Sequence, residues 1–156
     1  MSKKIYLSEV MMPSQTNPSG NVHGGELMKM MDSTAYAAAR KYCHSNVVTA
    51  RVDELEFHTP ILIGDLVTCT AEVIYVGRTS MEVAVNVEVL EAEQKPQHAL
   101  SAYFTMVALD RNGRPMTVPP MQLETEEEKA LFEEAKKRHE MYHERKKQRK
   151  DAKDFQ

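Results

Sequence analysis

A single carboxylate stands between residues 27 and 42, in a segment where most residues are apolar or small. It belongs to Asp32, which two methionines precede and two hydroxyl residues follow. Burying an ionised carboxylate without a partner is costly, so this side chain must reach water, a hydrogen-bond partner or a reacting group. Asp32 is therefore a candidate general base or nucleophile. A solvent-facing or hydrogen-bonded structural aspartate is the alternative.

Two glycines, Gly24 and Gly25, end a run of turn-forming residues that begins at Asn17. If a helix follows, the backbone N–H groups of Gly24, Gly25 and Glu26 stand at the positive end of its dipole. Such a terminus polarises a carbonyl or holds an oxyanion. The alternative is a tight loop that needs only the conformational freedom of glycine.

The spacing of these groups sets a geometric condition. Asp32 lies seven residues beyond Gly25, about 10 Å along a helix axis. An attacking group and an oxyanion donor must both come within roughly 3 Å of the same carbonyl. Two antiparallel helices from two subunits satisfy this condition more easily than one helix. A catalytic Asp32 thus predicts an obligatory dimer with composite sites.

The elements that position these residues follow from hydrophobic spacing. Apolar residues recur at steps of three and four from Glu26 to Tyr42, which predicts a buried helix rich in alanine and methionine. Period-two or continuous apolar patterns predict four strands within residues 47–57, 67–73, 81–89 and 99–109. A short strand precedes the helix. This order predicts an α+β fold in which a curved antiparallel sheet wraps around one central helix.

Composition narrows the classes of function. The chain has 156 residues, 42% hydrophobic and 28% charged, with a net charge of −3. These values predict a globular domain, and they do not favour nucleic-acid binding, which needs a basic surface. Neither a segment for membrane insertion nor a secretory signal is predicted. Cys43 and Cys69 lack metal-site spacing, which favours a reducing, cytoplasmic compartment.

The chain is predicted to divide into a domain over residues 1–121 and a charged helical tail over residues 122–156. A helix is expected from Glu124 to Lys150, with acidic residues toward its start and basic residues toward its end. That order complements a helix dipole. The tail is interpreted as a dipole-matched surface helix, and binding of an acidic partner is the alternative.

Several short motifs occur together in one order along residues 7–121. They are Asn17, Gly20, His23-Gly24-Gly25, Met31-Asp32, Asn46-Val47-Val48-Thr49-Ala50, Phe57-His58-Thr59-Pro60, Gly64-Asp65, Gly77-Arg78-Thr79-Ser80 and Phe104-Thr105-Met106-Val107-Ala108-Leu109. Together they resemble the hotdog-fold acyl-CoA thioesterases, most of all the cytosolic acyl-CoA hydrolase branch. The resemblance does not extend to the tail.

The resemblance implies hydrolysis of fatty acyl-CoA to a free fatty acid and coenzyme A, a reaction of fatty acid metabolism. Asp32 matches the catalytic carboxylate, acting as general base on water or as a nucleophile that forms an anhydride. Asn17 matches a position that orients water or substrate, and Gly24 and Gly25 match the carbonyl-polarising helix terminus. No metal and no cofactor are expected. Thr34 or Ser33 is a candidate hydrogen-bond partner of the carboxylate or of water, and a hydroxyl on the helix surface is the alternative.

Coenzyme A also requires a phosphate site. Arg78, Thr79 and Ser80, in the turn that begins at Gly77, offer a guanidinium, two hydroxyls and backbone amides. These groups suit phosphate oxygens, although such a turn is often only a turn. The resemblance favours CoA binding here, and it implies assembly as a trimer of dimers, a homohexamer.

Two alternative functions stay open. A hotdog enoyl-CoA hydratase or dehydratase would resemble its relatives through an aspartate two residues before Asn-Pro and a histidine soon after. Here Gln15 stands before Asn17-Pro18 and His23 comes later, which disfavours that reaction. A non-catalytic CoA- or nucleotide-binding domain would keep Arg78 to Ser80 and would not need Asp32.

Overall fold

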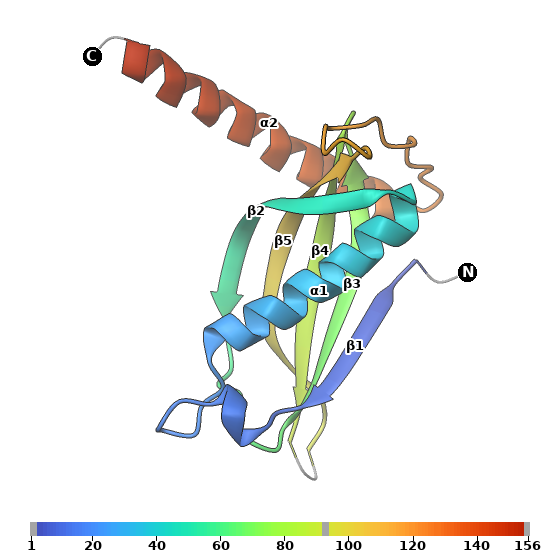
Figure 1. Cartoon of the computed structure of the whole chain (residues 1–156). Helices are drawn as coiled ribbons and strands as arrows, with labels where there is room; N and C mark the ends of the chain where they lie inside the picture. The colour runs from blue at the N-terminus through green and yellow to red at the C-terminus, as the bar shows by residue number, and fades with distance from the viewer. Residues whose placement is uncertain (1–2, 92–93, 155–156) are drawn as a thin grey trace. The chain divides into compact units, whose positions relative to one another are not determined.

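The computed structural model describes residues 3–91 and 94–154 of the chain (Figure 1). It divides into two compact units, Met1–Pro120 and Met121–Gln156. The first unit holds one antiparallel sheet and a long helix, and the second holds a single helix. Each unit is described by itself below.

The sheet of the first unit has five strands in the order β1-β3-β4-β5-β2. The strands are β1 (Ile5–Val10), β2 (Asn46–Phe57), β3 (Leu66–Val76), β4 (Ser80–Leu90) and β5 (Gln97–Leu109). Every pair of neighbours is antiparallel. Side chains alternate between the two faces of a strand, and the period-two pattern of β4 puts Val83, Val85, Val87 and Val89 in the core.

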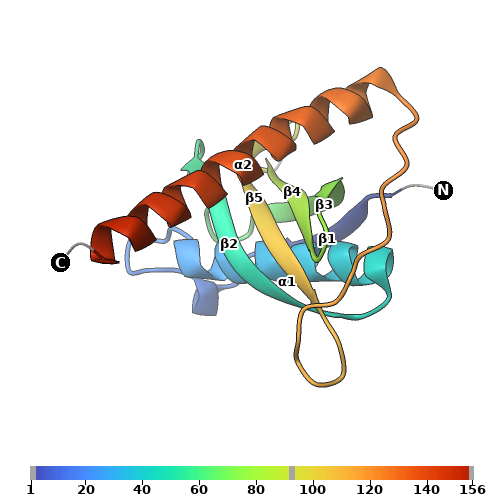
Figure 2. The ribbon, with the colours of Figure 1, turned by 90° about the horizontal axis from the view of Figure 1, so that it is seen from above.

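Helix α1 (Gly24–Cys43) lies across one face of this sheet and contacts all five strands (Figures 1 and 2). Its buried residues are Leu27, Met30, Met31, Thr34, Ala35, Ala38 and Ala39. Alanine side chains allow the helix to approach the strands closely, while the methionines fill the remaining space. The helix ends at Cys43 and is capped by His44, which adopts a left-handed conformation with φ of 55°.

Edge strand β2 is irregular in two places. Its register against β5 shifts between Thr49 and Arg51 and again between Asp53 and Glu56. Glu54, inside the second irregularity, has a φ of 52°, which is uncommon for a residue with a side chain. Arg51 donates from Nε to Asp53 Oδ2 at 2.7 Å between the two shifts. Both irregularities are β-bulges, in which one strand gains a residue relative to its partner.

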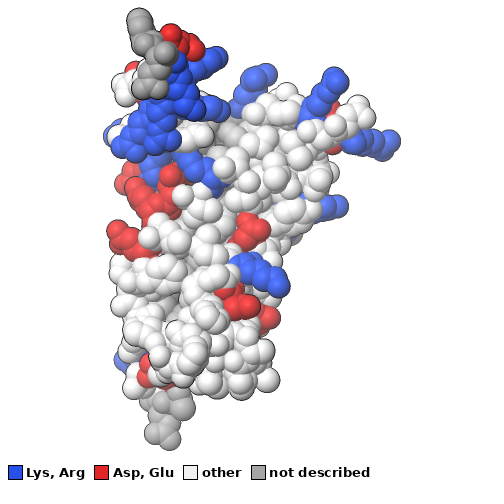
Figure 3. Space-filling model, turned by 60° about the vertical axis from the view of Figure 1, so that its left-hand side comes forward, with Lys and Arg blue, Asp and Glu red and all other residues white. Residues whose placement is uncertain are grey.

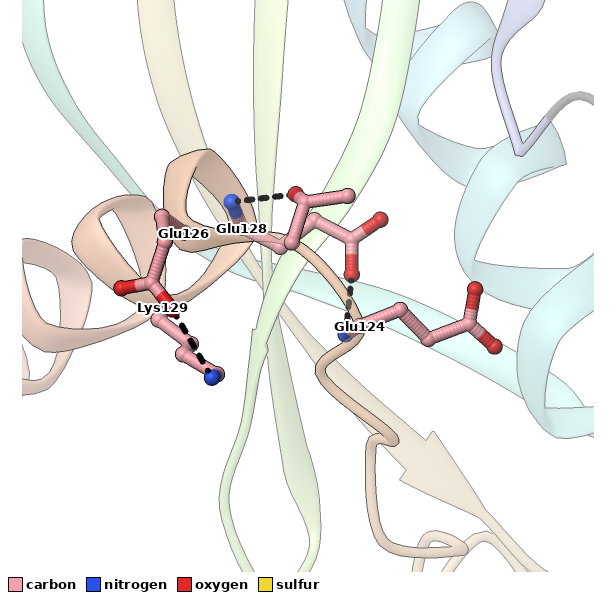
Figure 4. A network of polar contacts seen from close by, with 5 residues as sticks. Glu124, Glu126, Glu128 and Lys129 are labelled. Carbon is pink, nitrogen blue, oxygen red and sulfur yellow. Dashed lines mark hydrogen bonds and ion pairs between the residues drawn. The ribbon is translucent and has the colours of Figure 1, made fainter.

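The second unit contains helix α2 (Glu126–Asp154). Thr125 caps its start, because its hydroxyl accepts the N–H of Glu128 at 3.1 Å, and the Glu128 carboxylate accepts the N–H of Glu124 at 2.9 Å (Figure 4). The acidic start and the basic end of this helix can be followed in Figure 3. Among the described residues, no helix is long and apolar enough to cross a membrane.

The predicted order of one short strand, a buried helix and four strands is confirmed. Helix α1 begins two residues earlier than the hydrophobic pattern indicates, because the two glycines join its first turn. Helix α2 begins two residues later than predicted, after its Thr125 cap, and extends four residues further, to Asp154. A charged helix end without apolar spacing gives no sequence signal for its limit.

Candidate active site

The Asp32 carboxylate is half-buried and has one defined partner on the neighbouring strand. Thr49, on β2, donates its hydroxyl to Asp32 Oδ1 at 2.5 Å. The hydroxyl also lies 3.3 Å from the sulfur of Met106. Thr49 shares its strand face with the buried Val47, so it points toward α1. The contact fixes one carboxylate oxygen and leaves Oδ2 without a hydrogen bond in the described part of the chain.

Neither Thr34 nor Ser33 is the partner of this carboxylate, so the first of the two predicted roles is wrong, and the alternative of a surface hydroxyl fits Ser33. Thr34 is buried and its hydroxyl donates to the backbone oxygen of Met30 at 2.7 Å, one turn back along the helix. Ser33 is exposed. Residues one or two positions from Asp32 face other sides of α1. Sequence reasoning missed Thr49, although a polar residue at an inward position of a strand is the signal that would have found it.

The N-terminus of α1 presents free backbone donors. His23 is its N-cap, without a side-chain hydrogen bond. Within residues 3–91 and 94–154, the N–H groups of Gly24 and Gly25 donate no hydrogen bond. The prediction for Glu26 is wrong, because its N–H already donates to the His23 oxygen at 3.0 Å in a tightened first turn. Two donors therefore remain for a carbonyl oxygen.

Phe57, at the end of β2, lies directly over the first glycine of this terminus. A Cβ added to Gly24 would stand 3.3 Å from Phe57 Cζ, whereas one added to Gly25 would meet nothing within 4 Å. The Phe57 side chain is 56% exposed. A side chain at Gly24 would thus need the exposed Phe57 ring to shift by a few tenths of an ångström, and Gly25 is open on its outer side.

The loop before α1 is held by Asn17. Its side-chain oxygen accepts the N–H groups of Ser19 and Asn21 at 3.0 and 3.1 Å. Gly20 takes the positive φ of 84° that this loop requires. The Nδ2 group of Asn17 donates no hydrogen bond within the described residues. This amide is therefore available to water or to a ligand, as its predicted role requires.

Gln15, which stands where a hydratase would carry an acid, has a structural role. Its side-chain oxygen accepts the N–H of Met12 at 2.8 Å. Its backbone oxygen accepts the N–H of His23 at 2.9 Å. Both bonds hold the segment before α1 in place. The first engages the side-chain oxygen of Gln15 with a backbone N–H group.

The turn from Gly77 to Ser80 joins β3 to β4. The N–H of Gly77 donates to the Ser80 oxygen at 2.8 Å, and the oxygens of Arg78 and Thr79 accept the N–H groups of Val118 and Ala108 at 2.9 Å. Arg78 is exposed. The turn is therefore held in place through its carbonyls. Arg78 thus offers an exposed guanidinium on a fixed backbone, an arrangement that suits an anionic ligand.

The predicted residues do not all come together within one chain. Ser80 pairs with Val107, which pairs with Val48 near the start of β2, directly after α1 ends. The turn therefore lies near the C-terminal end of a helix about 30 Å long, whereas Gly24 and Gly25 form its other end. Asp32 lies in between, about 10 Å along the axis from Gly25. Within one chain, the Asp32 carboxylate and the amide donors of Gly24 and Gly25 therefore lie apart.

The cysteines take no part in this chemistry. Burial raises the pKa of the Cys69 thiol to about 11, the nearby charge of Glu9 acts in the same direction, and a hydrogen bond with Thr34 opposes both. A thiol of this kind is a poor nucleophile at neutral pH. In the described parts of the chain, no group of three or more histidine, cysteine or acidic side chains could hold a metal ion.

Comparison with known proteins agrees with this geometry. Residues 19–94 match the model of the thioesterase superfamily. The chain is 34% identical to the acyl-CoA hydrolase of Staphylococcus aureus, solved in complex with butyryl coenzyme A, coenzyme A and coenzyme A disulfide. That match covers 98% of this chain and 94% of the other, with a TM-score of 0.86. An apo-hexameric acyl-CoA thioesterase is also 34% identical over 92% of both chains, with a TM-score of 0.85.

A mammalian relative is longer. The chain is 42% identical over 130 residues to the cytosolic acyl coenzyme A thioester hydrolase of Mus musculus. The match covers 81% of this chain and 34% of that protein, so the chain spans about a third of its length. Together, the fold, the matched residues and these relatives show that the chain belongs to the hotdog-fold acyl-CoA thioesterases of the thioesterase superfamily.

Proposed function

We propose that the chain hydrolyses acyl-CoA thioesters to a free fatty acid and coenzyme A, with Asp32 as the catalytic carboxylate. The observation that carries this proposal is the half-buried Asp32 side chain, oriented by Thr49 with one oxygen left over for chemistry. A carboxylate oriented in this way takes a proton from water more effectively than a mobile one.

The reaction needs few protein groups. Water attacks the thioester carbon as Asp32 takes its proton, the carbonyl oxygen becomes an oxyanion, and the C–S bond then breaks. The departing thiolate of coenzyme A takes up a proton. In the variant with Asp32 as nucleophile, its oxygen attacks the carbon first, and water then cleaves the resulting anhydride. A thiolate leaves readily, so neither route requires a metal or a strong general acid.

Substituted forms of the Staphylococcus aureus enzyme support this set of residues. Structures of that enzyme exist with alanine in place of an aspartate, an asparagine and a threonine. These three positions are spaced along that chain as Asn17, Asp32 and Thr49 are spaced here. We assign orientation of water or substrate to the free Asn17 amide, and orientation of the carboxylate to Thr49.

A composite site resolves the separation within one chain. If two α1 helices lie antiparallel across a twofold axis, the glycine amides of one chain approach Asp32 of the other. The same arrangement brings the turn from Gly77 to Ser80 toward the partner's glycines. Arg78, Thr79 and Ser80 then bind the phosphates of coenzyme A. Edge strand β2 supports such pairing, since Val48 and Phe57 on it are 47% and 56% exposed.

The quaternary structure we propose is a homohexamer, a trimer of such dimers, because solved relatives are hexameric. We also propose a cytoplasmic location, for which the cytosolic mouse relative is the support. Light scattering after size-exclusion chromatography measures the assembly directly, and a hexameric mass is expected. A dimeric mass would contradict the trimer of dimers, and a monomeric mass would also contradict the composite site.

Substitution of Asp32 tests the activity. Asp32→Asn keeps the shape and an acceptor for Thr49 but removes the base, so kcat is expected to fall by about 10²–10⁴-fold. Thiol release from an acyl-CoA measures turnover, and calorimetry measures coenzyme A binding, which is expected to remain unchanged. Turnover within tenfold of the unsubstituted chain would overturn the role of Asp32. Binding without turnover in the unsubstituted chain would instead indicate a non-catalytic CoA-binding domain.

Mixed dimers test the composite site. Equal amounts of Asp32→Asn and Gly24→Pro chains are unfolded, mixed and refolded together. If each site takes Asp32 from one chain and the glycine amides from the other, half of the dimers are mixed and each keeps one intact site. About a quarter of full activity is then recovered from two inactive parents. No recovery in a mixture that is shown to exchange chains would place both groups in one chain.

A further inference from the structure

Two histidines lie one turn apart on helix α2, outside the residues used above. They are His139 and His143, whose Nε2 atoms are 3.0 Å apart. Their ring centroids are 4.3 Å apart, with the planes at 73°. Residues four apart share a helix face, and here the two rings bring their Nε2 atoms together. His143 is exposed and His139 is half-buried.

From this convergence we infer a binding site for a divalent transition-metal ion, held by Nε2 of His139 and Nε2 of His143. Imidazole nitrogens bind such ions at about 2.0–2.1 Å. Two nitrogens 3.0 Å apart, each at that distance from one ion, subtend about 94°. The distance between the two nitrogens therefore suits one ion, and the rings turn so that both lone pairs point away from the N···N line toward it. An ion takes the place of the proton shared between them, and the donor ring moves its own proton to Nδ1.

Ligand type also selects the ion. Imidazole nitrogens suit Cu²⁺, Ni²⁺ and Zn²⁺. Mg²⁺ and Ca²⁺ prefer oxygen ligands and are excluded by ligand type. The expected order of affinity is thus Cu²⁺, then Ni²⁺, with Zn²⁺ weaker than Cu²⁺.

The surrounding sequence limits what the ion does. Residues 139–143 read His-Glu-x-x-His, the order found in zinc proteases, where the glutamate acts as general base and a third protein ligand completes the site. The described residues supply no third ligand. Water then fills the remaining positions. The site is accordingly a clamp that links two turns of α2, and it is assigned no hydrolytic role.

Calorimetric titration of the untagged, chelator-treated full chain with Ni²⁺ tests this site. One ion per chain is expected to bind, with an increase in helical circular dichroism, and Mg²⁺ is expected to give no heat. His139→Ala and His143→Ala are each expected to weaken binding at least tenfold. Absence of saturable Ni²⁺ binding to the unsubstituted chain would overturn the inference.

Two controls separate this pair from other histidines. His98→Ala removes a ring that lies near His58, with centroids 5.1 Å apart, and is expected to leave Ni²⁺ binding unchanged. The double variant His143→Ala with Glu144→His keeps the number of histidines but puts the second ring on another side of the helix, so binding is expected to be lost. Full affinity in the double variant, or loss in His98→Ala, would show that the ion binds elsewhere.

Discussion

The role of the α1 terminus is tested by comparing two substitutions of Gly24. Gly24→Pro removes one of the two free N–H donors, whereas Gly24→Ala keeps it. Both variants add the same Cβ, 3.3 Å from the end of the Phe57 ring, and proline also replaces the amide hydrogen with its ring Cδ. Proline is favoured at the first position of a helix. The preceding residue, His23, already has φ −60° and ψ 134°, a conformation compatible with a following proline.

The magnitude follows from the function of the donor. Removing one oxyanion donor typically lowers kcat by about 10²–10³-fold, equivalent to about 2.7–4 kcal/mol of transition-state stabilisation. That loss is expected for Gly24→Pro relative to Gly24→Ala, with little change in KM, because the bond strengthens only as the oxyanion forms. The assay is steady-state hydrolysis of an acyl-CoA, with thermal unfolding measured in parallel.

Equal kcat values for the two variants, both folded, would refute the assignment of the Gly24 amide. A loss confined to KM would mean that the terminus binds substrate and transition state equally well. Either result would leave the role of Asp32 intact, because the two groups are tested by separate substitutions.

Three further predictions concern single residues. Thr49→Val removes the donor to Asp32 and is expected to lower kcat about 10- to 150-fold, which is the equivalent of a hydrogen bond to a charged group. Thr34→Val is the control, and it should change the urea midpoint of unfolding but leave kcat unchanged. Because burial raises the pKa of Cys69 from 9.0 to about 11, folding stability is expected to fall as pH rises through that interval in urea titrations, and Cys69→Ala should flatten the fall. His44→Gly relieves the left-handed end of α1 and should raise the free energy of unfolding by about 1 kcal/mol, whereas Lys41→Gly inside the helix should lower it by a similar amount.

The fold was accessible from the sequence because its elements carry strong local periodicity. The alternation along β4 and the steps of three and four along α1 survive in the structure almost unchanged. Asp32 and the two glycines were identifiable for a similar reason, since a lone acid and a glycine pair stand out locally. Thr49 was not, because its partner lies 17 residues away and the contact depends on how α1 packs on β2.

The converging rings of His139 and His143 were also missed, although their spacing is visible in the sequence. The tail was interpreted through its charges, and histidines count for little in a charge pattern. In the structure, the 3.0 Å distance between the two ring nitrogens identifies this pair as a candidate binding site on a helix surface that is otherwise only polar.

The paired irregularities of β2 tie the length of that strand to the position of Phe57. Each register shift places one extra residue of β2 opposite β5, and the pairing continues beyond it, so that Phe57 still faces Leu100. Loss of the extra residue at either shift would remove that bulge and leave Phe57 on its present face, whereas loss of a residue outside the shifts would turn Phe57 to the opposite face of the sheet. Natural length variation in this strand should therefore be confined to the two shifts.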